Sequence, residues 1–193
     1  MACYLSISMS IGGYKIRNQS AIHFITFAVV EWVDVFSRKE YRDIVVDSIK
    51  YCQDKKGLLL NGWCLMSNHL HLVASAKHAD LSDILRDFKK FTSLSIIKAI
   101  SMAKLESRRE WMLRIFHEQG MKNSRNTRYQ FWRQDNQPKE IYSSAFALQK
   151  LNYIHNNPVE SGIVEKAEDY LYSSARNYQT GMLKNGLLDI VLL

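Results

Sequence analysis

Two histidines separated by a single residue, His69 and His71, are the most chemically suggestive pair in the sequence. They stand at the head of an apolar run with strand character, HLHLVASA over 69–76. Side chains two apart on a strand point to the same face, so both imidazoles can reach one metal ion or one phosphate. An H-x-H also arises often by chance, with both rings merely satisfied by local hydrogen bonds, and taken alone the pair leaves both interpretations open.

A tyrosine and an asparagine near the other end of the chain form a second candidate pair. Residues 143–157 have the pattern of a helix, which Pro158 is expected to end at Asn157. Tyr153 and Asn157 are four residues apart, so they are neighbours on the helix surface, away from its apolar stripe. A tyrosine on a polar helix face is usually a surface or interface residue, and the helix alone does not single it out as a nucleophile.

The elements that must position these side chains follow a recognisable order. In chain order they are a strand at 21–32 buried on both faces, a helix capped by Ser37 and ended by Gly57, a hairpin of strands 58–66 and 69–76, and a helix opened by Asp80. With one more strand, this order predicts an α+β fold. It would be a ferredoxin-like (RRM-like) antiparallel sheet with helices packed on it, the tyrosine helix lying near the C-terminus.

The composition favours one compact domain with a polyanionic partner. Of 193 residues, 47% are hydrophobic and only 23% charged, which is enough apolar sequence for a core and argues against disorder. The 26 Lys and Arg against 19 Asp and Glu give a formal charge of +7, which favours nucleic acid over an anionic membrane. No apolar run approaches the roughly 20 residues that a membrane span requires.

The excess positive charge is concentrated in residues 108–139, called the basic stretch below. It holds eight basic and three acidic residues, a net +5, with five aromatic residues interleaved among them. One interpretation is a solvated loop pinned by core aromatics. The other is a nucleic-acid surface on which Lys and Arg meet phosphates and aromatic rings stack on unpaired bases.

Several segments, taken together, carry a specific resemblance. They are WCLMSNHLHLV (63–73), DLSDILRDFKKFTS (80–93), QFWRQ (130–134), YIHNNPVESGIV (153–164) and DYLYSSARNY (169–178). In composition and order they resemble the REP-associated tyrosine transposases of the HUH single-tyrosine transposase superfamily. The resemblance extends over residues 9–180 as a single catalytic domain, which leaves 1–8 as an N-terminal extension and 181–193 as a C-terminal tail.

The resemblance implies a metal-dependent single-stranded DNA endonuclease and strand transferase that acts on hairpin or palindromic DNA during transposition. His69 and His71 fall on the HUH pair, which holds a divalent cation at the scissile phosphate together with an amide ligand, here Asn157. Tyr153 falls on the nucleophile, which leaves a 5′-phosphotyrosine and a free 3′-hydroxyl. The expected cation is Mg²⁺ or Mn²⁺, and two imidazoles suit Mn²⁺ better.

Candidate DNA contacts follow from the positive charge of two segments. They are Arg86, Lys89, Lys90 and Thr92 on the helix after the histidine strand, and Arg128 and Arg133 in the basic stretch. For the two lysines, the alternative is an ordinary solvated helix face. The segment before the tyrosine helix, DNQPKEIYSSAFALQ, departs from the family's usual pattern and weakens any inference about DNA contacts made there.

Other interpretations remain open at the level of sequence. A domesticated protein could bind hairpin DNA with little or no cleavage. An RNA-binding RRM-like module would explain the sheet and the charge but not the histidine pair, and Phe24 and Trp63 only partly supply the aromatic sheet face it needs. Tyr142 is a rival nucleophile, although it precedes the helix and has no amide four residues later.

The resemblance also bears on partners and location. It implies a cytoplasmic, nucleoid-associated protein of a prokaryote whose partner is single-stranded or hairpin DNA, with no membrane partner. Relatives in the superfamily include homodimers and monomers, and the sequence does not decide between them.

Overall fold

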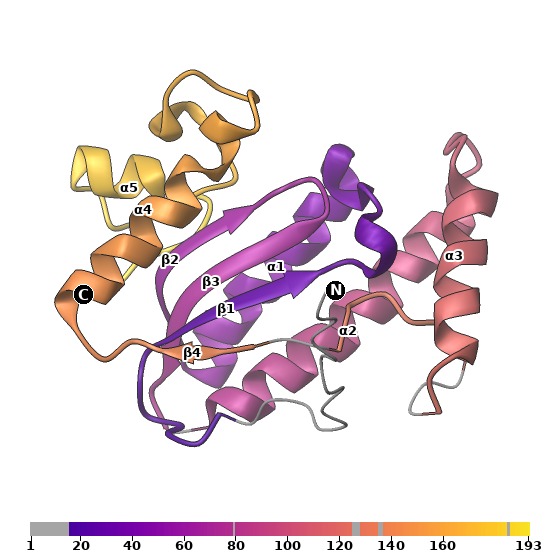
Figure 1. The fold of residues 1–193 in the computed structure, drawn as a ribbon. Helices are drawn as coiled ribbons and strands as arrows, with labels where there is room; N and C mark the ends of the chain where they lie inside the picture. The colour runs from indigo at the N-terminus through magenta and orange to yellow at the C-terminus, as the bar shows by residue number, and fades with distance from the viewer. Residues whose placement is uncertain (1–15, 79, 125–127, 135–136, 185) are drawn as a thin grey trace, which may run out of the picture.

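A four-stranded antiparallel sheet organises the chain (Figure 1). The computed structural model describes residues 16–78, 80–124, 128–134, 137–184 and 186–193. The strands are β1 (His23–Ala28), β2 (Leu58–Leu65), β3 (His69–Ala76) and β4 (Lys139–Glu140), arranged in the order β2-β3-β1-β4. Because β3 lies between β1 and β2 and is antiparallel to both, this is the split βαβ arrangement, and the predicted ferredoxin-like fold is confirmed.

Helices cover both faces of this sheet. In the described part of the chain they are α1 (Lys39–Lys56), α2 (Leu81–Met102), α3 (Arg109–Met121), α4 (Ser144–Glu160) and α5 (Ala175–Thr180), with short 3₁₀ turns at Val30–Trp32, Val35–Ser37 and Ala167–Asp169. α1 and α2 pack together on one face, whereas α4 lies on the other (Figure 1). None of these helices has the length and apolarity needed to cross a membrane.

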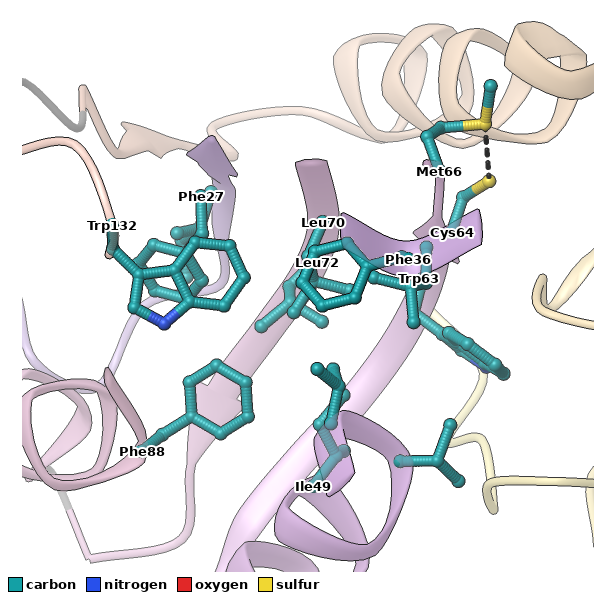
Figure 2. Packing of buried hydrophobic residues seen from close by; sticks show 14 of the residues in the cluster. Phe27, Phe36, Ile49, Trp63, Cys64, Met66, Leu70, Leu72, Phe88 and Trp132 are labelled. Atoms are coloured by element: carbon teal, nitrogen blue, oxygen red, sulfur yellow. Dashed lines mark hydrogen bonds between the residues drawn. The ribbon is translucent and has the colours of Figure 1, made fainter. Parts of the chain in front are cut away.

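The alternation of side chains along each strand gives the two faces different roles. Phe27, Leu70 and Leu72 point toward α1 and α2 and form the main core (Figure 2). There the ring of Phe27 lies 5.8 Å from that of Phe88 on α2. Since His71 alternates with Leu70 and Leu72 along β3, its side chain points to the opposite face, beneath α4.

The first strand is shorter than its apolar sequence predicts. β1 ends at Ala28 and not at residue 32. Glu31 and Trp32 have φ angles of 52° and 53°, in the left-handed region that turns the chain out of an extended path. The buried Val29 and Val30 still belong to the core, which explains why the sequence pattern alone overextends the strand.

The first long helix begins one residue later than expected. α1 starts at Lys39, and Ser37 is not its N-cap because the Ser37 hydroxyl donates a hydrogen bond to the carbonyl of Asp34. The predicted end is confirmed: Gly57 adopts a φ of 73° and closes the helix in the left-handed conformation.

α4 starts as expected and ends later. The hydroxyl of Ser143 accepts a hydrogen bond from the helix's first turn, as an N-cap does. The helix then continues past Asn157 to Glu160, with Pro158 inside its last turn, so the predicted end is wrong by three residues. A proline there removes only one backbone donor, and the amide of Ser161 still bonds to the carbonyl of Asn157.

The close approach of α4 to the sheet depends on Gly62 in β2. A Cβ atom at this position would stand 2.4 Å from Cδ2 of Leu151 and 3.2 Å from Cδ1 of Ile154. Next to Ile154, Nε2 of His155 lies 2.8 Å from Oγ of Ser174, and that hydroxyl also accepts a hydrogen bond from the amide of Trp63 in β2. These contacts fix both the height and the rotation of α4 above the strands.

The C-terminal tail, residues 181–193, packs along β2. Leu188 and Ile190 are buried, the amide of Val191 donates to the carbonyl of Leu60, and the Asn61 side chain donates to the carbonyl of Val191. The tail therefore lies against the outer strand of the chain's own sheet without forming a regular strand. The expected N-terminal extension, 1–8, falls outside the described residues.

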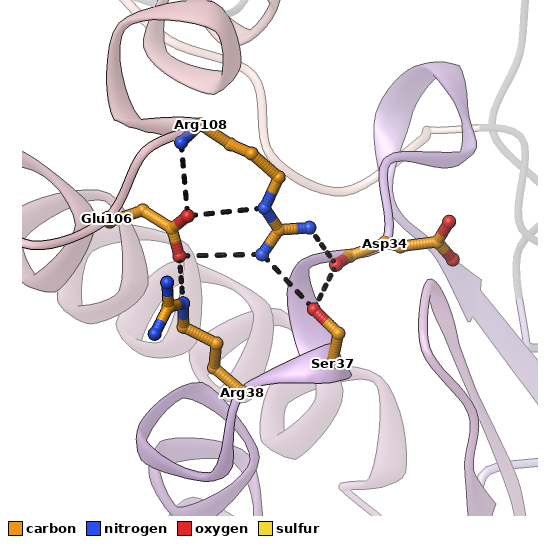
Figure 3. A network of polar contacts seen from close by, with 5 residues as sticks. All are labelled: Asp34, Ser37, Arg38, Glu106 and Arg108. Atoms are coloured by element: carbon orange, nitrogen blue, oxygen red, sulfur yellow. Dashed lines mark hydrogen bonds and ion pairs between the residues drawn. The ribbon is translucent and has the colours of Figure 1, made fainter.

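A buried carboxylate, Glu106, joins the α2–α3 connection to the segment before α1 (Figure 3). Its side chain is 1% exposed and forms ion pairs with Arg38 and Arg108. Arg108 also donates to the carbonyl of Asp34 and to the hydroxyl of Ser37. Burial opposes ionisation of Glu106, but the hydrogen bonds from the two guanidinium groups outweigh it and hold the Glu106 pKa below its usual value.

The approach of α4 to β2 predicts the effect of adding one methyl group. Gly62→Ala should lower the free energy of unfolding by roughly 1–3 kcal/mol, because the methyl overlaps the packed Leu151 side chain. Chemical denaturation measures the difference. In a double variant, Leu151→Ala makes room for the methyl, so the combined loss should be smaller than the sum of the two single losses. Additive losses would contradict the close packing.

The Glu106 network predicts a pH-dependent contribution to stability. Glu106→Gln should lower the free energy of unfolding by roughly 1–3 kcal/mol at neutral pH, since two guanidinium groups lose a charged acceptor. The Glu106 pKa is lower in the folded than in the unfolded state, so this contribution is present above the ordinary value of 4.5 and is lost as pH falls through the folded-state value. Urea denaturation of both proteins at a series of pH values should show the difference shrinking in acid, and a constant difference would refute this assignment.

Candidate active site

His69 and His71 lie together on the α4-facing side of β3. Their ring centroids are 4.7 Å apart, with ring planes at 76°. On the neighbouring strand, Ala28 is paired with His69 and Thr26 with His71. The predicted convergence of the two imidazoles on one face is therefore present, at the end of β1 where the chain leaves the sheet.

Each imidazole is held through its Nδ1 atom. His71 Nδ1 lies 2.8 Å from the hydroxyl of Thr26, and His69 Nδ1 lies 2.7 Å from the side-chain oxygen of Asn68. Nε2 of His71 is buried and has no hydrogen-bond partner. A buried polar atom without a partner is costly, and metal-ligating histidines commonly have one ring nitrogen fixed in this way while the other binds the ion.

Tyr153 and Asn157 approach the histidines from α4. The Tyr153 ring centroid is 5.4 Å from that of His71 and 6.1 Å from that of Phe24, and the residue remains 47% exposed. The amide nitrogen of Asn157 donates to the carbonyl of Tyr153 at 2.7 Å, and its side chain lies close enough to His69 to raise the pKa of that imidazole. Side chains more than 80 positions apart in the sequence thus surround one small volume.

The surroundings favour neutral imidazoles. Burial lowers the pKa of His71 to about 3, and repulsion from Lys150 and from His69 in its protonated form adds to the shift. Burial also lowers the pKa of His69, although the neighbouring side chain of Asn157 and the carboxylate of Asp34 oppose the shift. A histidine must be unprotonated to bind a metal ion, so both rings are in the required state at neutral pH.

The donor set fits a divalent cation of borderline softness. Among the described residues, no group of three His, Cys, Asp or Glu side chains is arranged to hold a metal ion. The candidate set here differs because its third member is an amide: two imidazole nitrogens from His69 and His71 and the side-chain oxygen of Asn157. Nitrogen donors of this kind suit Mn²⁺ better than Mg²⁺, and the unpaired Nε2 of His71 is an atom that an ion would satisfy.

A lysine that was not among the predicted site residues completes the group. Nζ of Lys150 lies 5.8 Å from the centroid of the Tyr153 ring, 5.1 Å from Phe24 and 5.0 Å from Phe146. Lys150 is three residues before Tyr153 on α4, and this spacing is the sequence signal that could have found it. Thr26 was missed too, because its role depends on the register between β1 and β3.

The DNA-contact residues predicted on α2 lie across the sheet from the histidines. Arg86 is exposed and paired with Asp83, and Lys90 is exposed on the same helix. Lys89 donates to the carbonyl of Arg133 and lies over the ring of Phe27. Thr92 is fully buried, where its hydroxyl accepts a hydrogen bond from Trp132, so the structure removes Thr92 from the set of surface contacts.

The described part of the basic stretch contains both buried aromatic residues and arginines that lie beside aromatic rings. Phe131 and Trp132 are buried in the core and pin the chain, as the loop interpretation expects. Arg128 is exposed beside the ring of Tyr129. The guanidinium of Arg133 lies 5.5 Å from the centroid of the Trp32 ring, which places it on the histidine side of the molecule.

The rival nucleophile Tyr142 lies elsewhere. It is 77% exposed, and its ring stacks on Phe146 with centroids 4.8 Å apart. Within the described part of the chain, its ring contacts neither histidine. Of the two tyrosines, Tyr153 is the one whose ring lies beside His71.

Comparisons with known proteins agree with this architecture. The family described as "Transposase IS200 like" matches residues 17–119, which is more than half of the chain. A solved structure, described as a REP-associated tyrosine transposase bound to a REP hairpin, superposes with a TM-score of 0.58. It is 15% identical and covers 93% of this chain and 95% of its own, so the likeness concerns the fold. No curated protein gives a significant match by sequence.

The family match extends from before β1 into α3 and includes both histidines. The chain belongs to the IS200-like transposase family.

Proposed function

We propose that this protein is a metal-dependent single-stranded DNA endonuclease and strand transferase with Tyr153 as its nucleophile. The observation that carries the proposal is the half-exposed phenol 5.4 Å from His71, in a group with His69 and Asn157. Membership of a transposase family supports DNA as the substrate. The hairpin bound by the solved relative supports hairpin DNA in particular.

The proposed step is a transesterification at phosphorus. The Tyr153 oxygen forms a bond to the phosphorus, the phenolic proton is lost, and the bond to the 3′ oxygen of the preceding nucleotide breaks. That oxygen takes up a proton and becomes a free 3′-hydroxyl, while the downstream strand stays attached to the tyrosine through its 5′-phosphate. Because a phosphodiester is exchanged for another phosphodiester, a 3′-hydroxyl can reverse the step without ATP.

His69, His71 and Asn157 would hold the divalent cation, Mg²⁺ or Mn²⁺. When bound, such an ion polarises the phosphoryl oxygens and orients the phosphate. Thr26 and Asn68 keep the two rings in fixed orientations with Nε2 available.

Lys150 would act beside the nucleophile. Its ammonium group lies over the Tyr153 ring and supplies positive charge where the phenol loses its proton and the phosphate approaches.

Two arginines are the leading DNA contacts under this proposal. Arg133 lies beside Trp32 on the histidine side, and the exposed Arg128 is in the same stretch. Arg86, Lys89 and Lys90 on α2 are separated from the histidines by the sheet, so DNA would reach them only beyond the cleavage point. Assembly as a homodimer stays a prediction.

The nucleophile assignment predicts a covalent adduct of defined polarity. With a hairpin oligonucleotide and Mn²⁺, a label at the 3′ end should appear on the protein in a denaturing gel, whereas a 5′-end label should not. Tyr153→Phe should reduce adduct formation by more than about a hundredfold, since it removes the attacking oxygen. Tyr142→Phe is the matched control and should leave it unchanged.

Two results would contradict this assignment. Loss of the adduct in Tyr142→Phe but not in Tyr153→Phe would transfer the role to the other tyrosine. Binding of hairpins without an adduct under any divalent metal would instead support a domesticated DNA-binding protein.

The ligand assignment predicts the effect of metal removal and of removing one imidazole. Chelation should abolish the adduct, and added Mn²⁺ should restore it. By titration calorimetry, His71→Ala should weaken Mn²⁺ binding by roughly 10–100-fold or more, because one nitrogen donor is lost. His117→Ala, which removes an exposed histidine from α3, should bind Mn²⁺ like the wild type. Equal affinity in the wild type and His71→Ala would rule out this ligand set.

A further inference from the structure

An exposed tryptophan stands directly beside the candidate histidines. Trp32 is 51% exposed, and its ring centroid lies 5.9 Å from that of His69, with the ring planes at 82°. Tryptophan has the largest apolar side chain, and leaving half of it in water forgoes much of the stabilisation that burial would provide. The proposed nucleic-acid cleavage does not yet give this side chain a role.

The backbone holds Trp32 in place at a conformational cost. Glu31 and Trp32 are the two described non-glycine residues with positive φ, at 52° and 53°. Conformations of this kind are unfavourable for residues with a side chain and persist where surrounding contacts impose them. Here Asn68 imposes them in part, since its amide nitrogen donates to the carbonyl of Trp32 at 3.2 Å and to the Asp34 carboxylate at 3.0 Å.

The same asparagine links Trp32 to the site. The side-chain oxygen of Asn68 is the partner of His69 Nδ1, so one side chain fixes both the imidazole and the turn that carries the indole. The network around Glu106 holds the next residues, through the bond from Arg108 to the carbonyl of Asp34. The position of Trp32 relative to the histidines is therefore specified by the fold.

A guanidinium group accompanies the indole. Cζ of Arg133 lies 5.5 Å from the centroid of the Trp32 ring, and the amide of Arg133 donates to the carbonyl of Ala28 at the end of β1. An aromatic face with an arginine beside it is the combination that single-strand-binding proteins present to bases and to backbone phosphates.

We propose that Trp32 is a stacking platform for an unpaired nucleobase next to the scissile phosphate, with Arg133 facing the adjacent backbone phosphate. The inference rests on the proposed function, which puts the scissile phosphate at His69 and His71. A base and its phosphate are joined by a single sugar, so a base stacked on Trp32 keeps its phosphate near His69.

The ligand is single-stranded DNA, because in a duplex both faces of each base are covered by its neighbours. Stacking on an indole tolerates any base, so Trp32 would add affinity without selecting sequence.

The test separates the contribution of bases from that of phosphates. One probe is a DNA hairpin with a single-stranded flank of thymidines, and the other is the same hairpin with an abasic flank of equal length and charge. Binding is measured by fluorescence anisotropy with Tyr153→Phe as the background, which cannot form the proposed tyrosine adduct.

Trp32→Ala in this background should weaken binding of the thymidine flank roughly tenfold and leave binding of the abasic flank nearly unchanged. Trp32→Phe, which keeps an aromatic face, should recover most of the loss. Tyr51→Ala removes a comparably exposed aromatic side chain, 56% exposed on α1 across the sheet from the histidines, and should change neither affinity.

The outcomes distinguish this inference from the proposed cleavage. Equal effects of Trp32→Ala on the two flanks, or no effect, would overturn the stacking role even if the wild type forms the covalent adduct. A loss confined to the thymidine flank would support stacking even if no adduct forms, in which case only the cleavage proposal fails. Absence of binding to both hairpins would overturn both.

Discussion

The arrangement of the site depends on one packing contact, the seating of α4 on the sheet at Gly62. β3 can place two imidazoles on one face by its alternation alone, but the phenol and the amide come from a helix that follows them by a long stretch of chain. With no side chain at Gly62, Leu151 and Ile154 pack against the strand, and Tyr153 in the same turn of α4 lies beside His71 and Phe24. The core residues of α4 thus set the distance between the proposed ligands and the proposed nucleophile.

The orientation and charge of the two histidines likewise depend on the side chains around them. Thr26 and Asn68 each occupy one nitrogen of an imidazole, and burial keeps both rings uncharged. Nε2 of His71 is left without a partner, a condition that an ordinary core does not tolerate easily. This unpaired atom favours a binding site over the alternative in which the histidines only satisfy local hydrogen bonds.

Much of the fold was predictable because its signals are local. The histidine hairpin, the glycine that ends α1 and the serine that caps α4 are each encoded within a few residues. The errors arose where tertiary contacts override local pattern. Val29 and Val30 continue the apolar run although the regular strand β1 has ended at Ala28, and Pro158 is tolerated in the last turn of α4.

In the site, too, some features follow from local sequence and others from tertiary contacts. The proximity of His69 and His71 follows from strand periodicity. Thr26 is placed beside His71 by the register between β1 and β3, and Trp32 is placed beside His69 by a turn with positive φ angles. Thr92 was predicted as a surface contact from its place between basic residues, but it faces the core, where Trp132 needs an acceptor. Charge along the sequence thus locates a basic segment without showing which of its side chains reach solvent.

The seating of the last residues against β2 has a consequence for how the molecule behaves in a crowded solution. β2 is the outermost strand on its side, and an open strand edge is a template on which other chains can add and aggregate. Hydrogen bonds from Val191 to Leu60 and from Asn61 to Val191 engage part of that edge. Together with the bridge between Cys64 and Ser173, these bonds occupy edge positions on which another chain would otherwise pair.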